Sequence, residues 1–304
     1  MNNVLFTRIN IFRNLKDYKF LPKLEKEKAQ EIEDKVKQTI GTDFYKLNLS
    51  SAEVGVINYL KENALISKNS QIVFANKKNN VSVSLFEQEH ILIRATSFGF
   101  SKNTIQLALN TANKLASKLS LAYNDDYGFL MSNLTNVGCG LMLECDLDLN
   151  AIVGINKIEQ VKQNIRKLGF VLKEKEANIF TLFTTCNLGF SEKEIIDEFE
   201  KMVSKLQDLE VESAKMLDVS RHDEILDKIM RSQAIIGSAY LMSAEELKKH
   251  LSILRTGLNL GLNVIDCEVV NKIQQLVTNK NSEIVSQSEL IKLAEQVRKI
   301  VKGE

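Results

Sequence analysis

Residues 127–146 read YGFLMSNLTNVGCGLMLECD, and the fold prediction starts from this stretch. Asn136, Gly138 and Gly140 permit positive backbone φ angles and close approach of neighbouring backbone, which predicts a loop. The run that follows, residues 141–149, alternates apolar and polar side chains as a β-strand does. A loop that feeds a strand is a place where a ligand can bind. An ordinary hairpin turn has the same composition, so the pattern alone leaves both interpretations open.

The composition is that of a globular chain with no dominant charge. The 304 residues include 40 Lys and Arg against 39 Asp and Glu, a formal charge of +1, which gives no net field for nucleic acid or an anionic membrane. No signal-peptide pattern and no apolar run of membrane-spanning length occur, so we expect a cytoplasmic protein. The four cysteines, at 139, 145, 186 and 267, form no CxxC pair and have no His at zinc-ligand spacing. We therefore expect reduced, buried cysteines and no metal site.

Hydrophobic periodicity divides the chain into a mixed part and a helical part. Strands are predicted at 4–11, 71–75, 81–86, 91–96, 141–149, 170–173 and 178–185. Helices are predicted at 23–40, 47–65, 101–121, 155–168, 191–217, 225–241, 244–254, 269–277 and 290–300. Ser50 or Ser51 is the expected N-cap of the second helix, and turns are expected at Asn79-Asn80 and at 174–176. Because strand patterns stop near residue 218, we predict an α+β domain over 1–218 and a helical domain over 219–304.

Sequence motifs for common nucleotide-binding loops are absent. The chain has no GxxxxGK[ST] and no GxGxxG that opens a helix after a strand, and it has no HExxH or GxSxG. Of three histidines, only His90 lies beside two acids at a strand junction, within Glu87-Gln88-Glu89-His90. His90 is therefore the one histidine that we consider functional from its context.

Four stretches together resemble the guanidino kinase (phosphagen kinase) superfamily, and most closely the bacterial protein arginine kinases of the McsB type. They are VLFTRINIFRNLKDYKF at 4–20, SLFEQEHILIRA at 84–95, YGFLMSNLTNVGCGLM at 127–142 and ILRTGLNLGL at 253–262. The match is collinear from about residue 4 to residue 300. The resemblance implies a curved antiparallel sheet flanked by helices, followed by an all-helical C-terminal domain that mediates dimerisation.

The resemblance also implies a reaction. The family transfers the γ-phosphoryl group of ATP to a guanidinium nitrogen, which is mostly a matter of positioning and electrostatic stabilisation. Such a site needs arginines and Mg²⁺ around the triphosphate, and a carboxylate that orients and deprotonates the guanidinium. ATP and Mg²⁺ are thus the cofactors if the chain is active, and there are none if it is not.

At the catalytic positions implied by the resemblance, this sequence departs from the family. The acids Glu87 and Glu89 remain, but the family's base aligns with Gln88, whose amide cannot accept the proton. The family's active-site Cys aligns with Asn133. The catalytic set is therefore degenerate.

The nucleotide-binding positions implied by the resemblance are changed as well. Arg8 and His90 are retained, whereas the family's arginines are replaced at three positions, which are Asn10, Leu92 and Met142. Arg94 lies two residues beyond Leu92 and so on the same face of a strand, where it could replace the lost cation. At 289–294 the sequence ELIKLA aligns with the family's phosphoarginine-binding motif and lacks its arginines.

These departures lead to a main hypothesis of a catalytically inactive homologue, a pseudokinase that works as a regulatory or binding module. The alternative is an active protein-arginine phosphotransferase with a rebuilt site of Arg8, Glu87, Glu89, His90 and Arg94. A third reading is a receptor for phosphorylated arginine held by Arg8 and His90. By resemblance, the expected assembly is a homodimer or heterodimer. The candidate partners are an active arginine kinase, its activator or a Clp-type stress-response protein. We expect the chain to bind neither nucleic acid nor membrane.

Overall fold

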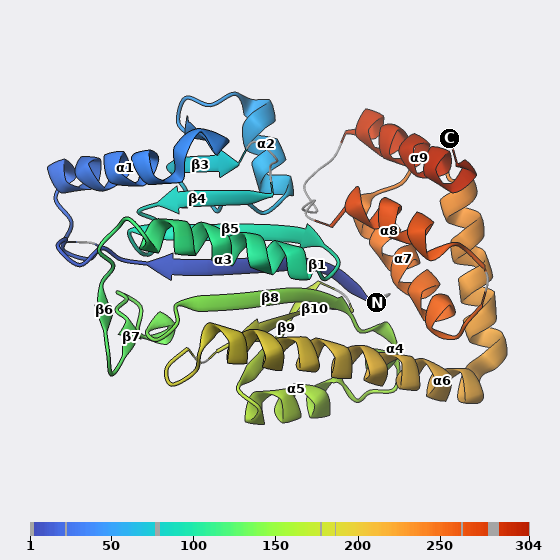
Figure 1. The fold of residues 1–304 in the computed structure, drawn as a ribbon. Coiled ribbons are helices and arrows are strands. Elements are labelled where there is room, and N and C mark those ends of the chain that lie inside the picture. The colour runs from blue at the N-terminus through green and yellow to red at the C-terminus, as the bar shows by residue number, and fades with distance from the viewer. Residues whose placement is uncertain are drawn as a thin grey trace. The chain divides into compact units, whose positions relative to one another are not determined.

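A computed structural model describes residues 3–21, 23–76, 80–176, 178–185, 187–262, 264–278 and 286–303. It contains an antiparallel sheet flanked by helices and a long helical C-terminal region, as predicted (Figure 1). Eight strands hydrogen-bond in the order β2-β3-β4-β5-β1-β8-β10-β9. These strands are β1 Val4–Arg13, β2 Phe44–Asn48, β3 Ile72–Asn76, β4 Val81–Leu85, β5 Ile91–Phe98, β8 Leu141–Asp148, β9 Phe170–Glu176 and β10 Ile179–Thr184. Two short strands, β6 Tyr123–Asn124 and β7 Gly128–Phe129, pair separately.

Helices lie between strands up to β10, and only helices follow among the described residues after it. They are α1 Lys26–Ile40, α2 Val54–Glu62, α3 Lys102–Ala116, α4 Asn150–Gly154, α5 Ile158–Lys167, α6 Glu192–Ser238, α7 Ala244–Asn259, α8 Cys267–Gln275 and α9 Gln287–Lys302, with 3₁₀ turns at Gly41–Asp43 and Leu134–Asn136. Two compact units result. The sheet unit comprises residues 7–144 and 183–200, and the helix-rich unit comprises residues up to 6, 145–182 and 201 onward.

In the sheet unit, strand register decides which side chains share a face. The pairs β2–β3, β3–β4 and β4–β5 are antiparallel, and Ser84 lies opposite Leu92 while Ser82 lies opposite Arg94. Since side chains alternate along a strand, Leu92 and Arg94 share the face that carries Val73 of β3. Val73 packs in an apolar cluster with Leu60 of α2. Leu92 and Arg94 therefore lie on the α2 side of these strands.

The opposite face of the same strands carries large apolar side chains, including Phe74, Val83 and Ile93, all of them buried. Helix α3 packs against β5 and against α1 (Figure 1). It begins at the N-cap Ser101, whose hydroxyl accepts a hydrogen bond from the Thr104 amide. Burial of this face fixes the register of β4 and β5, because a one-residue shift would turn the apolar side chains to the other side.

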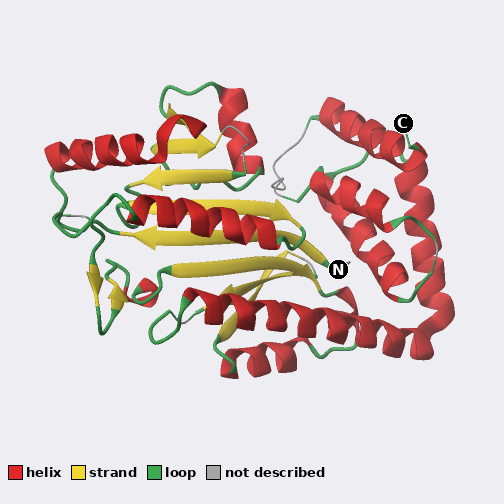
Figure 2. Cartoon of the chain, in the orientation of Figure 1, coloured by secondary structure: helices red, strands yellow, loops and turns green. Residues whose placement is uncertain are grey.

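In the helix-rich unit, helices α7 to α9 and the last turns of α6 enclose their own apolar core. Its centre includes Ile229, Leu247, Leu251, Ile273 and Val297. Figure 2 shows only helices and connecting loops from α7 onward among the described residues. This confirms the prediction of a helical C-terminal region.

Local patterns mispredicted several boundaries. Residues 44–48 form strand β2, so residues 47–48 pair with β3 and do not begin the helix predicted at 47–65. The helix begins after Glu53, and Ser50 instead bonds the side chain of Asn48, so the predicted serine N-cap was wrong. The helix predicted at 155–168 is α5, which runs from Ile158 to Lys167, while the short helix α4 before it was missed. Residues 174–176, predicted as a turn, belong to β9. The helices predicted at 191–217 and 225–241 together form α6, and the backbone is non-helical between them at Arg221, which makes a kink. Asn79 and Cys186 lie outside the described residues.

Candidate functional site

The loop before β8 is shaped by two glycines that no other residue can replace without strain. Gly138 has φ +119°, and a Cβ atom there would lie 2.1 Å from the backbone oxygen of Asn187. Gly140 has φ +59°, and its Cβ would lie 2.8 Å from the backbone oxygen of Phe12. The Asn187 side-chain oxygen accepts hydrogen bonds from the Leu141 amide at 2.9 Å and from the Cys139 thiol at 3.0 Å. This close packing fixes where β8 begins.

Neither Asn133, at the family's cysteine position, nor the nearby Cys139 is available as a nucleophile. The side-chain oxygen of Asn133 accepts hydrogen bonds from the Thr135 amide at 3.1 Å and hydroxyl at 2.9 Å, so it caps a 3₁₀ turn. Cys139 is buried, and burial raises the pKa of its thiol to about 11. The thiol is therefore protonated at neutral pH, whereas the thiolate is the nucleophilic form.

Glu89, one of the two acids retained in the predicted catalytic set, holds the loop in place. Its carboxylate is fully buried and accepts the side-chain amide of Asn14 at 2.6 Å. It also accepts the backbone amides of Ser132 at 2.9 Å and Asn133 at 3.0 Å. With three donors converging on it, Glu89 has a structural role in the described fold. Gln88, its neighbour, is exposed.

His90 is equally committed to the fold. Its Nδ1 accepts the Leu15 amide at 3.1 Å, so in the neutral ring Nε2 carries the proton and donates to the Lys19 carbonyl at 3.0 Å. The rings of Tyr18 and Phe20 meet it edge-on, with centroids at 6.3 and 5.9 Å. Burial lowers the pKa of His90, and a protonated Nδ1 would lose its bond to Leu15. His90 therefore holds the segment after β1 in place.

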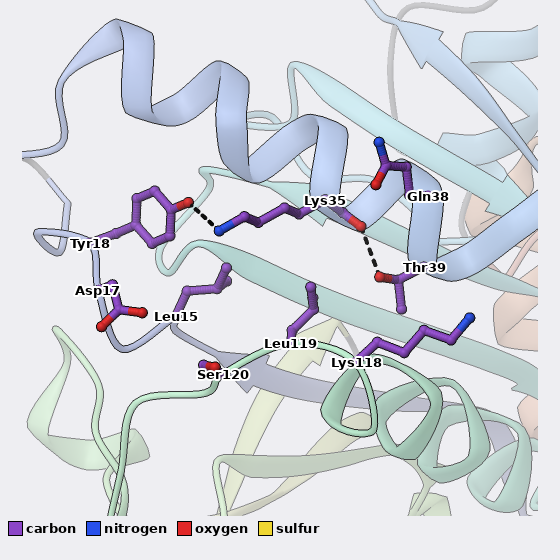
Figure 3. Close-up of a pocket in the computed structure, with 9 residues that line it drawn as sticks. All are labelled: Leu15, Asp17, Tyr18, Lys35, Gln38, Thr39, Lys118, Leu119 and Ser120. Carbon is purple, nitrogen blue, oxygen red and sulfur yellow. Dashed lines mark hydrogen bonds between the residues drawn. The ribbon is translucent and has the colours of Figure 1, made fainter.

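A pocket of about 410 Å³ lies beside that segment (Figure 3). The amino group of Lys35 points at the phenol of Tyr18 and donates to it at 2.7 Å, and the Thr39 hydroxyl donates to the Lys35 carbonyl at 2.8 Å. Lys118 and Ser120 form the opposite wall. None of the predicted site residues lines this pocket.

Glu87 and Arg94 form a nearly buried ion pair. Both terminal nitrogens of Arg94 donate to Glu87, at 2.9 and 2.7 Å, and the side chains are 11% and 2% exposed, respectively. The hydroxyls of Ser67, at 2.7 Å, and Ser70 also donate to Glu87. Burial raises the pKa of this carboxyl, but the hydrogen bonds and charge of Arg94, with the two serine hydroxyls, outweigh burial and lower it to about 2. Arg94 therefore neutralises an acid of the fold.

Arg8 is paired in a similar way, on strands β1 and β8. Its Nε donates to Glu144 at 2.7 Å, and the side-chain amide of Asn10 donates to the other oxygen of the same carboxylate at 3.1 Å. Arg8 and Glu144 are 16% and 13% exposed. A phosphate group approaching Arg8 would meet the negative charge of Glu144 and would have to displace it.

Two positions at which the resemblance implies arginines are part of one apolar cluster. Leu92 is buried with Phe12 and Met131, and Met142 packs against them. Burying a phosphate against such side chains would remove its hydration without supplying donors, which is costly. The sheet face around these residues is therefore built as a packed core.

The predicted residues thus fall into separate groups. Arg8 and Asn10 bond Glu144, Arg94 bonds Glu87, and His90 bonds the backbone of Leu15 and Lys19. In these hydrogen bonds the three groups have different partners. Sequence reasoning missed Glu144, Ser67 and Ser70. Glu144 could have been suspected, because it is a charged residue two positions after Met142 on the same face of an alternating strand. The serines lie in loops with no distinctive pattern.

Two properties of the described residues concern metal ions and membranes. No group of three or more His, Cys, Asp or Glu side chains there is arranged to hold a metal ion. Within the same part of the chain, no helix combines the length and the apolar character that crossing a membrane requires.

Two family models match this chain. Residues 10–213 match the model of the ATP:guanido phosphotransferase C-terminal catalytic domain. The chain belongs to this family. Residues 222–304 match the model of the C-terminal domain of the protein-arginine kinase McsB.

Individual relatives have low sequence identity to this chain. The chain is 28% identical over 280 residues to a protein-arginine kinase of Clostridium perfringens, covering 85% of this chain and 82% of that one. It is 29% identical over 280 residues to one of Bacillus velezensis, covering 85% and 77%. Among solved structures, the substrate-free duplicated taurocyamine kinase of Schistosoma mansoni aligns with a TM-score of 0.62 at 21% identity, over 69% of this chain. The chain spans only 33% of that duplicated kinase. The structure of lombricine kinase aligns with a TM-score of 0.62 at 17% identity, covering 68% of this chain and 66% of that one.

Proposed function

We propose that this chain is a protein-arginine kinase homologue that has lost phosphoryl transfer and acts as a regulatory or binding subunit. The observation that carries the proposal is the apolar cluster of Phe12, Leu92, Met131 and Met142. Two of its members, Leu92 and Met142, stand at positions where the family resemblance implies phosphate-binding arginines. An apolar face there opposes the binding of a triphosphate and its Mg²⁺.

The remaining polar groups of the site support the same conclusion. Arg8 and Arg94 each form an ion pair with a carboxylate of the chain, and Gln88 stands where the resemblance implies the base. Loss of one preorganised donor costs on the order of 10²–10³ in rate. Such losses are not additive, but two of them at full strength would already bring the rate close to that of the uncatalysed reaction. The residues present at these positions do not fit ATP.

The competing candidate is an active protein-arginine phosphotransferase. It is favoured by the retained acids Glu87 and Glu89 and by relatives that are named protein-arginine kinases. This function would require Arg8 to leave Glu144 and Arg94 to leave Glu87 when nucleotide enters. Both ion pairs are largely buried, and breaking a buried pair costs about 3–5 kcal/mol. The inactive assignment therefore fits the contacts better.

We also propose a place and an assembly for the chain. The C-terminal match at 222–304 supports a dimerising role for the helical region over 219–304, either with a second copy or with an active protein-arginine kinase. An activator of such a kinase and a Clp-type stress-response protein are the other candidate partners. The balanced charge of +1 supports a cytoplasmic protein that binds neither nucleic acid nor membrane.

Binding of nucleotide gives the first test. A ligand that binds only the folded state stabilises it by RT ln(1 + [L]/Kd), which is about 2.7 kcal/mol at one hundred times Kd. We expect that millimolar Mg-ATP leaves the Tm of this protein unchanged in a thermal-shift titration. The protein-arginine kinase of Clostridium perfringens, titrated alongside, should show a saturable rise in Tm. A saturable rise in this chain that Arg8→Ala abolishes would contradict the proposal.

A further inference from the structure

A second pocket, of about 370 Å³, lies in the sheet unit, and Gly138 and Cys139 of the loop before β8 form part of its lining. Its size is within the range of small-ligand pockets, which is about 300–1,000 Å³. It lies between the two-stranded β6–β7 ribbon, helix α3 and the loop that leads into α6. Aromatic and acidic side chains dominate its walls, namely Tyr123, Tyr127, Phe129, Phe190, Asp126 and Glu192.

The aromatic walls of this pocket are open to solvent. Tyr123, Tyr127 and Phe190 are 54%, 57% and 51% exposed. Tyr123 meets Phe129 edge-on with ring centroids 5.2 Å apart, so part of the wall is held rigidly. A group of exposed aromatic rings around a pocket indicates a binding surface, whereas apolar side chains scattered singly over a surface do not.

The inner end of the pocket already holds one guanidinium group. The Cζ of Arg13 lies 3.7 Å from the centre of the Phe129 ring, and its Nη2 donates to Glu192 at 2.6 Å. Arg13 is only 3% exposed, and its Nε has no hydrogen-bond partner. The pocket thus combines an aromatic face and a carboxylate around a planar cation, which is the arrangement that recognises arginine.

Charge at the open end is unbalanced. The bond from Arg13 uses one oxygen of Glu192, and the other has no partner among the described contacts. The Asp126 carboxylate at the rim has none there either, while its backbone amide bonds Asn124. The side chains of Arg13, Glu192 and Asp126 carry one positive and two negative charges, so the pocket has a net charge of −1. A cation entering from solvent would balance it.

We propose that this pocket binds the side chain of an arginine presented by a partner protein. The flat guanidinium would stack on the exposed rings of Tyr127 and Phe190 and donate to Asp126 and to the second oxygen of Glu192. This geometry favours arginine over lysine, because an ammonium group neither stacks nor donates along two parallel directions. Phe129 packs against the apolar cluster, but none of Phe12, Leu92, Met131 and Met142 lines the pocket, so the proposal does not depend on whether phosphoryl transfer is retained.

The test is an NMR titration of the full-length ¹⁵N-labelled protein with Nα-acetyl-arginine amide in the absence of nucleotide. We expect saturable shifts of amides in 123–129 and 187–192. N-acetyl-citrulline amide, which has the same shape without the charge, should bind at least about tenfold more weakly because it lacks charge-assisted hydrogen bonds. N-acetyl-lysine amide should also bind more weakly.

Substitutions at exposed positions locate the site without disturbing the fold. Tyr127→Ala and Asp126→Asn should each weaken arginine binding about fivefold. Tyr240→Ala, which removes a ring that is 67% exposed in the helix-rich unit, should leave binding unchanged. The proposal is overturned if no saturable shift occurs, if citrulline or lysine binds as tightly as arginine, or if Tyr127→Ala and Asp126→Asn bind like the wild type.

Discussion

Arg94→Met lowers the free energy of unfolding by about 3–5 kcal/mol, because it leaves the Glu87 carboxylate buried without its cationic partner. Met keeps much of the Arg side-chain volume, so the effect is mainly electrostatic. Urea denaturation followed by circular dichroism measures it. Adding Glu87→Gln to Arg94→Met removes the unpaired charge and should restore most of the loss. A loss below about 1 kcal/mol for Arg94→Met would show that the pair is exposed and exchangeable.

The same pair gives stability a defined dependence on pH. The pKa of Glu87 is about 2 in the folded protein, against an ordinary value of 4.5. As pH falls, the unfolded chain takes up this proton first, so protonation favours unfolding. The contribution of Glu87 is therefore fully present above pH 4.5 and is lost as pH falls from 4.5 toward 2. The Glu87→Gln variant should lack this part of the acid-induced loss of stability.

Gly138→Ala has the other large expected effect, about 3 kcal/mol or more of destabilisation. Two costs add: the backbone has φ +119°, and the new Cβ would lie 2.1 Å from the backbone oxygen of Asn187. That oxygen also accepts the Cys139 amide at 3.2 Å, so relief of the clash disturbs the start of β8. Thermal denaturation of the purified variant measures the loss.

Gly99→Ala is the matched control for that substitution. Gly99 also has a positive φ, +69°, but no atom lies within 4 Å of its Cβ position. It should cost only the backbone strain, about 1 kcal/mol. Equal losses for Gly99→Ala and Gly138→Ala would mean that the contact with Asn187 relaxes freely, contrary to the tight loop described above.

Much of the fold follows from local sequence patterns, and the errors have a common cause. The alternation at 81–86 and 91–96 predicted β4 and β5, because one face of each strand is uniformly apolar. Strand β2 was missed, since residues 44–48 are only partly buried and are held by pairing with β3. A five-residue segment with no clear periodicity carries no local signal of that long-range partner.

The candidate site, too, could be predicted only in part from the sequence. The resemblance identified Leu92 and Met142 as altered positions from sequence alone. It could not show that they pack together with Phe12, because that contact joins strands far apart in the chain. Nor could it show that Glu144 engages Arg8, or that Glu89 and His90 support loops, since those roles depend on backbone groups that only the fold brings close.

The most direct measurement of the central claim is phosphoryl transfer itself. The purified protein is incubated with γ-labelled ATP, Mg²⁺ and an arginine-rich protein, with the Clostridium perfringens protein-arginine kinase as a positive control. We predict no acid-labile label on the substrate above the level seen without protein, while the control labels it readily. Acid-labile transfer by this chain that disappears in a correctly folded Arg8→Ala variant would contradict the account.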